Sequence, residues 1–230
     1  MDIFESVKMA VTTLTANKLR SSLTMLGITI GNAAVIALVG IGQGAQNYTS
    51  EKLESYGANS LFVYVSFEDA EGSTTSETPQ LVLSDAEAII TQAPAVKAVA
   101  PQISSQLSIS YLNRSTKTSI TGTTPGFLYV HNMTVAKGRF FNSSEQQQNV
   151  QVMTLGAELA QKLFGSEDPL GKKVQVGNVS FLVIGVMKAK GSFAGQNSDD
   201  AAYVPITTMA DQLTGLRSPY GIPIDSMQVS

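Results

Sequence analysis

The chain has 230 residues, of which only 14% are charged, against roughly 25% in typical soluble domains. It contains no cysteine and a single histidine, which excludes disulfides, thiolate zinc sites, iron–sulfur clusters, cysteine nucleophiles and multi-histidine metal sites. The formal net charge of −3 gives no overall attraction toward nucleic acid, so no nucleic-acid partner is expected.

The chain begins with an amphipathic segment. Apolar residues recur at helical spacing through the first 20 residues, and charged or polar residues fall on the other side. This pattern predicts a helix that lies on the inner leaflet of a membrane. Its apolar side is formed by Ile3, Phe4, Val7, Ala10, Val11 and Leu14.

An uncharged block follows, from Ser21 to Ser50. Within it, residues 23–41 are interrupted by only three polar side chains. As a helix these residues would span about 28 Å, close to the roughly 30 Å hydrocarbon core of a bilayer. Because a helix satisfies its own backbone hydrogen bonds, the block is predicted to cross a membrane.

The charges on either side of the block predict how it is oriented. The first 20 residues carry a net charge of +1, whereas residues 51–230 carry −4. The positive-inside rule then places the N-terminus in the cytoplasm and the bulk of the chain outside. We therefore predict a cytoplasmic helix over 1–20, a transmembrane helix over 21–44 and an extracytoplasmic domain over 45–230.

A cleaved signal peptide is the alternative interpretation of this block. Gly42-Gln43-Gly44 is a small-x-small pattern that a signal peptidase could cut. Against cleavage, the apolar core exceeds the usual length of about 7–15 residues, and the preceding segment is itself patterned as a helix. An uncut anchor is favoured, and a mature N-terminus near Ala45 would contradict it.

One face of the predicted membrane helix is suited to close packing. Gly27 and Gly31 lie four residues apart, with Asn32 beside them. Small residues let membrane helices approach closely, and an amide side chain can hydrogen-bond across the interface. A glycine-containing helix without a special partner is the alternative. The abundance of Gly, Ala, Thr and Asn favours packing against other helices.

Beyond this helix, short elements alternate without a repeat, which is typical of an α+β fold. A helix is expected to continue to Gly57, and residues 68–80 are expected to form a mobile loop. Ser84 and Glu87 predict a capping box. Strands are predicted over 61–67, 96–103, 106–112, 117–121, 150–155, 173–176, 180–187, 202–204 and 226–230, a loop over 122–126, and helices over 84–93, 156–164 and 206–213.

Few side chains offer reactive chemistry. His131 has no G-x-S-x-G elbow to serve and is expected to be structural. Asp199 and Asp200 could bind a cation together with Asn197, but in a Gly/Ser-rich loop they are expected to be solvated. Gly138–Phe141 (GRFF) is expected to form a hairpin corner with both rings in the core.

Two glycine-rich segments lack the features of nucleotide sites. The spacing from Gly165 to Gly171-Lys172 is one residue too long for a P-loop, and the segment is predicted to be a turn. Gly40-x-Gly42-x-Gly44 follows a membrane helix instead of a strand. No catalytic, cofactor-binding or metal site is predicted, and the chain is not expected to be an enzyme.

Residues 17–31 (NKLRSSLTMLGITIG), followed by Ala34–Ile36 and the Gly40–Gly44 repeat, resemble the start of MacB-type (MacB/FtsX-like) ABC transporter permeases. Tyr56–Asn59 resembles a landmark before the first outer strand, with Tyr56 in place of the usual Leu. Further landmarks of the outer domain are matched by Gly138–Phe141, Leu155-Gly156, Leu163–Gly165, Asp168–Gly171, Phe181–Val186, Lys190–Ser192 and Val204-Pro205.

The resemblance implies a permease of four transmembrane helices in the bacterial inner membrane, with the large periplasmic domain between the first two. It implies a homodimer, a cytoplasmic ATPase that binds ATP and Mg, and a periplasmic adaptor protein. ATP-driven motion would pass through the inner helix, where Phe4, Val7, Val11 and Leu14 would carry the coupling. The outer domain would have two lobes, about 45–103 plus 205–230, and an inserted lobe about 104–204.

This sequence departs from the family because it contains one membrane helix and stops within an apparent strand. It is therefore expected to be the N-terminal portion of a longer permease. Met1 directly before the inner helix predicts that no ATPase domain is fused in front of it, and an ATPase subunit is expected as a partner. The alternatives are a single-span anchored binding or sensor module and an anchored enzyme. The residues do not name the cargo.

Overall fold

The computed structural model describes residues 3–55, 60–65, 80–193 and 196–230. It divides into two compact units, residues 1–53 and 54–230, and each is described by itself. The helix cap expected at Gly57 and the loop expected over 68–80, apart from Gln80, lie outside the described residues.

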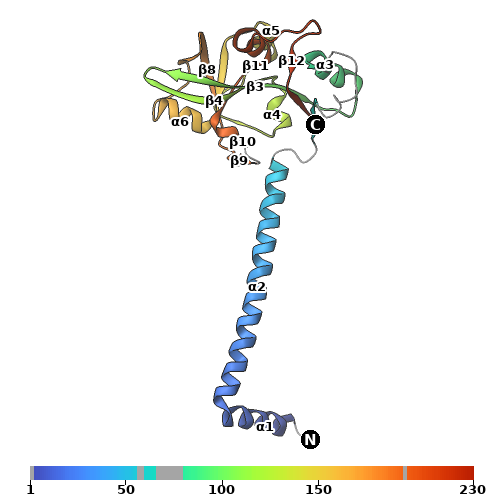
Figure 1. Cartoon of the computed structure of the whole chain (residues 1–230), viewed down its shortest axis with the longest axis vertical. Helices are drawn as coiled ribbons and strands as arrows, with labels where there is room; N and C mark the ends of the chain where they lie inside the picture. Colours follow the sequence, from blue (N-terminus) through green and yellow to red (C-terminus); the bar gives the residue numbers. More distant parts are fainter. Residues whose placement is uncertain (1–2, 56–59, 66–79, 194–195) are drawn as a thin grey trace, which may run out of the picture. The chain divides into compact units, whose positions relative to one another are not determined.

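The first unit consists of two helices that meet at a corner (Figure 1). Helix α1 spans Ile3–Ala16 and α2 spans Lys18–Ser55. At the corner, the Ser21 backbone N–H donates to the Asn17 carbonyl oxygen at 3.0 Å, and the Ser21 hydroxyl donates to the Leu14 carbonyl oxygen at 3.1 Å. These bonds satisfy carbonyl groups that the end of α1 would otherwise leave without partners.

Helix α2 contains the uncharged block. Over Lys18–Ser50 it is long and apolar enough to cross a membrane: its most apolar 18-residue stretch has a mean hydropathy of 2.0, and none of that stretch is buried. Hydroxyl groups within it are satisfied locally, since Thr29 donates to the Met25 carbonyl oxygen at 2.7 Å. Length and composition alone fit a membrane span, and a signal sequence near an N-terminus would share them.

The second unit is built around one mixed sheet whose strands come from distant parts of the chain (Figure 1). Neighbouring strands are antiparallel, except that β4–β11 and β6–β8 are parallel. The order is β1 (Leu61–Tyr64), β13 (Ser226–Val229), β3 (Val99–Tyr111), β4 (Arg114–Thr123), β11 (Ala201–Pro205), β6 (Val152–Leu155), β8 (Val179–Met187) and β5 (Val135–Gly138).

Strand β7 (Lys173–Val176) closes part of this sheet into a ring. It pairs with β3 through Val176 and Ile109, and with β8 through Val174 and Phe181. The strands β3, β4, β11, β6, β8 and β7 therefore follow one another around a closed circuit of hydrogen bonds. Closure removes sheet edges, and it leaves β1 and β5 as the two ends of the described sheet.

The main core occupies one face of these strands. Ile103 and Ile109 of β3, Ile120 of β4 and Phe181 of β8 are each no more than 1% exposed and belong to one cluster. Helix α6 (Ala157–Phe164) adds Leu159, Leu163 and Phe164 to the same cluster. Full burial of a side chain of this size contributes about 1.5–3 kcal/mol.

The predictions for the second unit, called the outer unit below, need several corrections. The two strands predicted over 96–103 and 106–112 are one strand, β3, over Val99–Tyr111, because Ser104 and Ser105 pair with Thr121 and Ile120 of β4. Strand β4 continues to Thr123, into the expected loop. Two short helices went unpredicted, α4 (Phe127–Val130) and α5 (Ser143–Gln147), as did strand β5.

Helix α3 (Leu83–Gln92) follows β2 (Leu81–Val82), which pairs with β12 (Pro223–Ile224). The capping box predicted from Ser84 and Glu87 is wrong. The helix begins one residue earlier, so Asp85 occupies the third helical position, where its carboxylate accepts from the Val82 backbone N–H at 2.9 Å.

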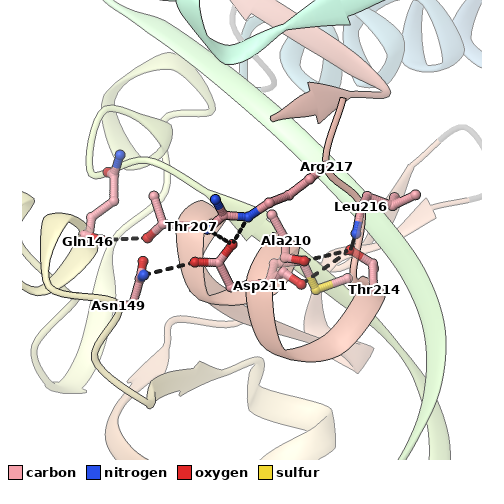
Figure 2. A network of polar contacts seen from close by, with 9 residues as sticks. Gln146, Asn149, Thr207, Ala210, Asp211, Thr214, Leu216 and Arg217 are labelled. Carbon is pink, nitrogen blue, oxygen red and sulfur yellow. Dashed lines mark hydrogen bonds and ion pairs between the residues drawn. The ribbon is translucent and has the colours of Figure 1, made fainter. Parts of the chain in front are cut away.

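The Asp211 carboxylate fixes the segment that leads back to β13 through hydrogen bonds to two other residues (Figure 2). Helix α7 (Ile206–Thr208) continues as a π-helix, η2 (Met209–Thr214), at the position predicted for a helix. Asp211 accepts from Asn149 Nδ2 at 2.9 Å through one oxygen and from Arg217 Nη2 at 2.6 Å through the other. The turn before β6 is thereby tied to the residues that follow the helix.

The GRFF segment begins at Gly138, the last residue of β5, and continues beyond the strand. The expected hairpin corner is wrong, because β5 pairs with β8, which lies far along the chain. The Phe140 and Phe141 rings stack with centroids 4.2 Å apart, and Phe141 is buried as predicted. Arg139 donates to both oxygens of Glu145, at 2.6 and 2.7 Å, and thereby holds the pKa of the Glu145 carboxyl below its usual value.

Backbones approach closely at this end of β5, and Gly185 of β8 is the residue that allows it. A Cβ atom on Gly185 would overlap the Arg139 carbonyl oxygen, which belongs to the backbone and cannot rotate away. We expect Gly185→Ala to lower the free energy of unfolding by about 1–3 kcal/mol. Urea unfolding measures this, and Ser180→Ala on the same strand, expected within about 0.5 kcal/mol of the parent, is the control. Equal stability of the two variants would contradict the close approach.

Candidate functional site

The predicted packing residues lie on one exposed stretch of α2. Gly27 and Gly31 are one helical turn apart, and a Cβ atom on either would meet no other group within 4 Å. Asn32 is exposed beside them. A second helix can therefore approach this stretch without meeting side chains at the two glycines. Its use as a packing surface stays a prediction.

The predicted coupling residues lie on α1, none of whose residues is buried. Phe4, Val7, Val11 and Leu14 are all exposed large apolar side chains. An apolar helix face of this kind is stable where lipid or another protein covers it. The coupling role also stays a prediction.

The sequence did not predict a polar groove on the outer unit. It is a pocket of about 450 Å³ over one face of β3, β4 and β11. Gln102, Ser104 and Gln106 of β3 line it beside Thr121 and Ser119 of β4, as the register of the two strands requires. Successive side chains of a strand point to opposite faces, so this polar face is the reverse of the apolar core.

His131, at the end of α4, lines the groove, and its ring packs against two other residues of the lining. Its Nε2 lies 3.0 Å from Gln102 Nε2, and its ring centroid lies 4.0 Å from that of Phe127. Burial and, secondarily, the Lys190 ammonium lower the pKa of His131 to about 4. An amide nitrogen can only donate, so the neutral ring accepts at Nε2 and carries its proton on Nδ1. Among the described residues no carboxylate or hydroxyl hydrogen-bonds to this ring.

The structure does not bring Asp199 and Asp200 together as cation ligands. Both belong to the short helix η1 (Ser198–Asp200), and the expectation that they are solvated is wrong. Asp199 accepts from the backbone N–H groups of Lys190 and Gly191 at 2.8 and 2.7 Å. Asp200 pairs with Lys162 at 2.8 Å and raises the pKa of that lysine. The part of the chain that the structure describes holds no cluster of three or more metal-ligating side chains.

The segment between α6 and β7 is a turn, as predicted. Gly165 ends α6 at a φ of +64°, and Glu167 pairs with Lys172 at 2.6 Å. The backbone N–H groups of Gly171 and Lys172 donate to carbonyl oxygens of Val183 and Pro169. These donors are already used, so they do not form a cradle for a phosphate.

The groove offers hydrogen-bonding groups without an activated nucleophile. Its lining from β3 is uncharged, β4 adds the basic side chain of Lys117, and the neutral His131 adds an acceptor that Gln102 already occupies. The alternation of Gln102, Ile103 and Ser104 is visible in the sequence as a strand signal. The pairing of β3 with β4 and β11, which assembles the groove, comes from residues that are distant in the chain.

The chain's single histidine allows a pH test. Since the folded-state pKa of about 4 lies below the ordinary 6.5, the unfolded chain takes up the proton first as the pH falls. We expect the free energy of unfolding to fall between about pH 6.5 and pH 4, by up to roughly 3 kcal/mol from this group. Urea unfolding of the parent and of His131→Gln isolates the effect, because the carboxyl titrations are common to both. Parallel pH profiles would contradict the burial of a neutral ring.

Comparisons with known proteins agree over nearly the whole chain. Residues 21–227 match the family model described as the MacB-like periplasmic core domain. A macrolide export ATP-binding/permease protein MacB of Bdellovibrio bacteriovorus is 35% identical over 217 residues, which cover 93% of this chain and 33% of that protein. The MacB protein of Azoarcus sp. is 37% identical, with 94% and 33% covered. The pyoverdine export protein PvdT of Pseudomonas aeruginosa is 30% identical, with 95% and 32% covered. The chain thus spans about a third of the length of these relatives.

Solved structures share the fold of the outer unit. The periplasmic region of MacB from Actinobacillus actinomycetemcomitans aligns with a TM-score of 0.61 at 22% identity, covering 77% of each chain. The extracellular domain of the noncanonic ABC-type transporter YknZ from Gram-positive bacteria gives 0.61 at 22% identity, covering 75% of this chain and 83% of that one. The α+β class with an N-terminal apolar helix is confirmed, and the chain belongs to the family of the MacB-like periplasmic core domain.

Proposed function

We propose that the chain is the portion of a MacB-like ABC transporter permease that carries the first membrane helix and the periplasmic core domain. In this role it transmits ATP-driven motion from a cytoplasmic ATPase to the outer domain, for export of a substrate. The observation that carries the proposal is the extent of the family match, which begins at residue 21 and so joins the apolar helix to the outer unit. Relatives at 30–37% identity are named as export ATP-binding/permease proteins.

The charge distribution supports an inner-membrane location with the N-terminus in the cytoplasm. The first 20 residues carry +1 and the outer residues 51–230 carry −4. Under this orientation α1 lies at the cytoplasmic surface, where its apolar face meets lipid or the ATPase. The groove and the ring of strands then belong to the periplasmic side.

The helix itself is suited to carry a displacement. Helix α2 runs without proline from Lys18 to Ser55, so its backbone ladder is continuous. At its start, the Ser21 hydrogen bond to Leu14 ties it to α1. A movement of α1 therefore passes into α2 as a whole, and no break in the helix absorbs it.

The partners in the proposal follow from the same surfaces. The open stretch at Gly27, Gly31 and Asn32 would pack against other membrane helices, including those of a second copy in a homodimer. ATP and Mg would be bound by the ATPase and not by this chain. A periplasmic adaptor would contact the outer unit.

A single-span binding or sensor module is the second candidate. The observation that favours it is the groove of about 450 Å³, a size that suits a small molecule. The activity of such a module would not depend on an ATPase. The coupling experiment on α1 below therefore distinguishes the two candidate functions.

Orientation can be tested directly because the chain has no cysteine of its own. In intact spheroplasts we expect a membrane-impermeant maleimide to label Lys137→Cys, which is exposed on the outer unit. Thr13→Cys in α1 should be labelled only after lysis. The reverse pattern would contradict the orientation, and loss of the Thr13→Cys site from the mature protein would indicate a cleaved signal peptide.

Coupling can be tested on α1. In the whole transporter we expect Val7→Asp to reduce export about tenfold, which corresponds to roughly 1.4 kcal/mol of lost apolar contact, while the ATPase still hydrolyses ATP. Macrolide accumulation in cells and ATP hydrolysis are measured together, because relatives are named for macrolide export. Met9→Asp is the matched control, since Met9 lies about 200° around the helix from Val7. Equal export by both variants would contradict a coupling face.

A further inference from the structure

The two ends of the sheet in the outer unit are protected differently. Strand β5 carries the exposed Lys137, an irregular register between Val135 and Lys137, and Gly138 at a φ of +72°. Edge lysines and bulges are devices by which natural sheets avoid pairing with another chain. Strand β5 is therefore a blocked edge.

Strand β1 has none of these devices. Its sequence, LFVY, contains no charge and no proline, and its pairing with β13 is regular from Leu61↔Val229 to Tyr64↔Ser226. No described strand pairs with its other side. Its backbone N–H and C=O groups on that side are a template for a further strand.

The side chains of β1 add apolar surface on both faces. Leu61, Phe62 and Tyr64 are 72%, 66% and 69% exposed, while Val63 packs against the main core. Single exposed apolar residues are ordinary on a protein surface, but three within four residues on an open edge form a patch that favours a contact.

We propose that β1 pairs antiparallel with β1 of a second copy of this chain, across a two-fold axis, and joins the two sheets. Antiparallel pairing of one segment with itself is the isologous contact that two-fold symmetry requires. The described residues 60–65 contain no charge, so the two copies do not repel each other there.

The inference rests on the proposed function, because the pairing needs a tether. Two four-residue strands are too short to hold a dimer alone. Helix pairing along α2 would raise the effective concentration of one β1 strand near the other. Six residue steps join Ser55 to Leu61 and can reach at most about 21 Å, which limits how far the strands of paired helices can separate.

Cysteine crosslinking of the whole membrane protein tests the contact. Because the sequence contains no cysteine, each introduced cysteine is the only site at which this chain can be crosslinked. With a short bis-maleimide crosslinker, which adds one cysteine thiol at each end, we expect dimers from Phe62→Cys and Val63→Cys, and from Ile28→Cys on α2. Lys137→Cys on the blocked edge should give none. Crosslinks at 28 without any at 62 or 63 would overturn the β1 contact and leave the proposed dimer intact. No crosslink at any of these sites would overturn the proposed dimer together with the contact.

A second variant tests whether the edge itself makes the contact. Tyr64→Lys adds a like charge to both copies of β1, and we expect it to slow crosslinking at Phe62→Cys at least tenfold. Leu112→Lys is the control, because Leu112 is also an exposed apolar residue, at 83% against 69% for Tyr64, and lies away from the edge. Crosslinking at Ile28→Cys should not change in either variant. Equal rates at position 62 in the two lysine variants would overturn the edge-to-edge contact.

Discussion

The structure of the outer unit depends on the hydrogen bonding of one strand, β3. Along one side it pairs with β13 over Val99–Gln102 and with β7 at Ile109 and Ser110, and along the other side it pairs with β4. Val99, Ile103 and Ile109 reach the main core, and Gln102, Ser104 and Gln106 line the polar groove. A single strand thus closes the ring, fills the core and shapes the groove, because each residue contributes to one face only.

Two ion pairs of the outer unit fix the loops that follow structural elements. Arg139 is held by Glu145 after β5, Arg217 by Asp211 after η2, and both contacts use two guanidinium hydrogen bonds. Pairs this exposed contribute little free energy. Their planar geometry still sets the direction in which each loop leaves its element. In a part proposed to transmit movement, loops with a fixed direction matter more than reactive groups.

Local signals predicted the elements that depend on nearby residues. The charge-free run predicted α2, the helical spacing predicted α1, and the strands predicted over 173–176 and 180–187 are β7 and β8. Predictions failed where distant residues decide the structure. Ser104 and Ser105 are weak strand formers, yet they extend β3 because Thr121 and Ile120 pair with them and Asp225 accepts from the Ser104 N–H at 2.7 Å. The groove escaped prediction for the same reason, since it forms only when β3, β4 and β11 meet. The two-lobed division is still a prediction.

The position of β13 between β1 and β3 also has a consequence for biogenesis. Ser226–Val229 are made long after Leu61–Tyr64, and at roughly 5–20 residues per second the interval is on the order of ten seconds or more. During that time β1 and the first residues of β3 have no partner strand. Until β13 is made, LFVY is an open apolar sheet edge of the kind that pairs with other chains, so the incomplete chain is more prone to aggregate than the finished one.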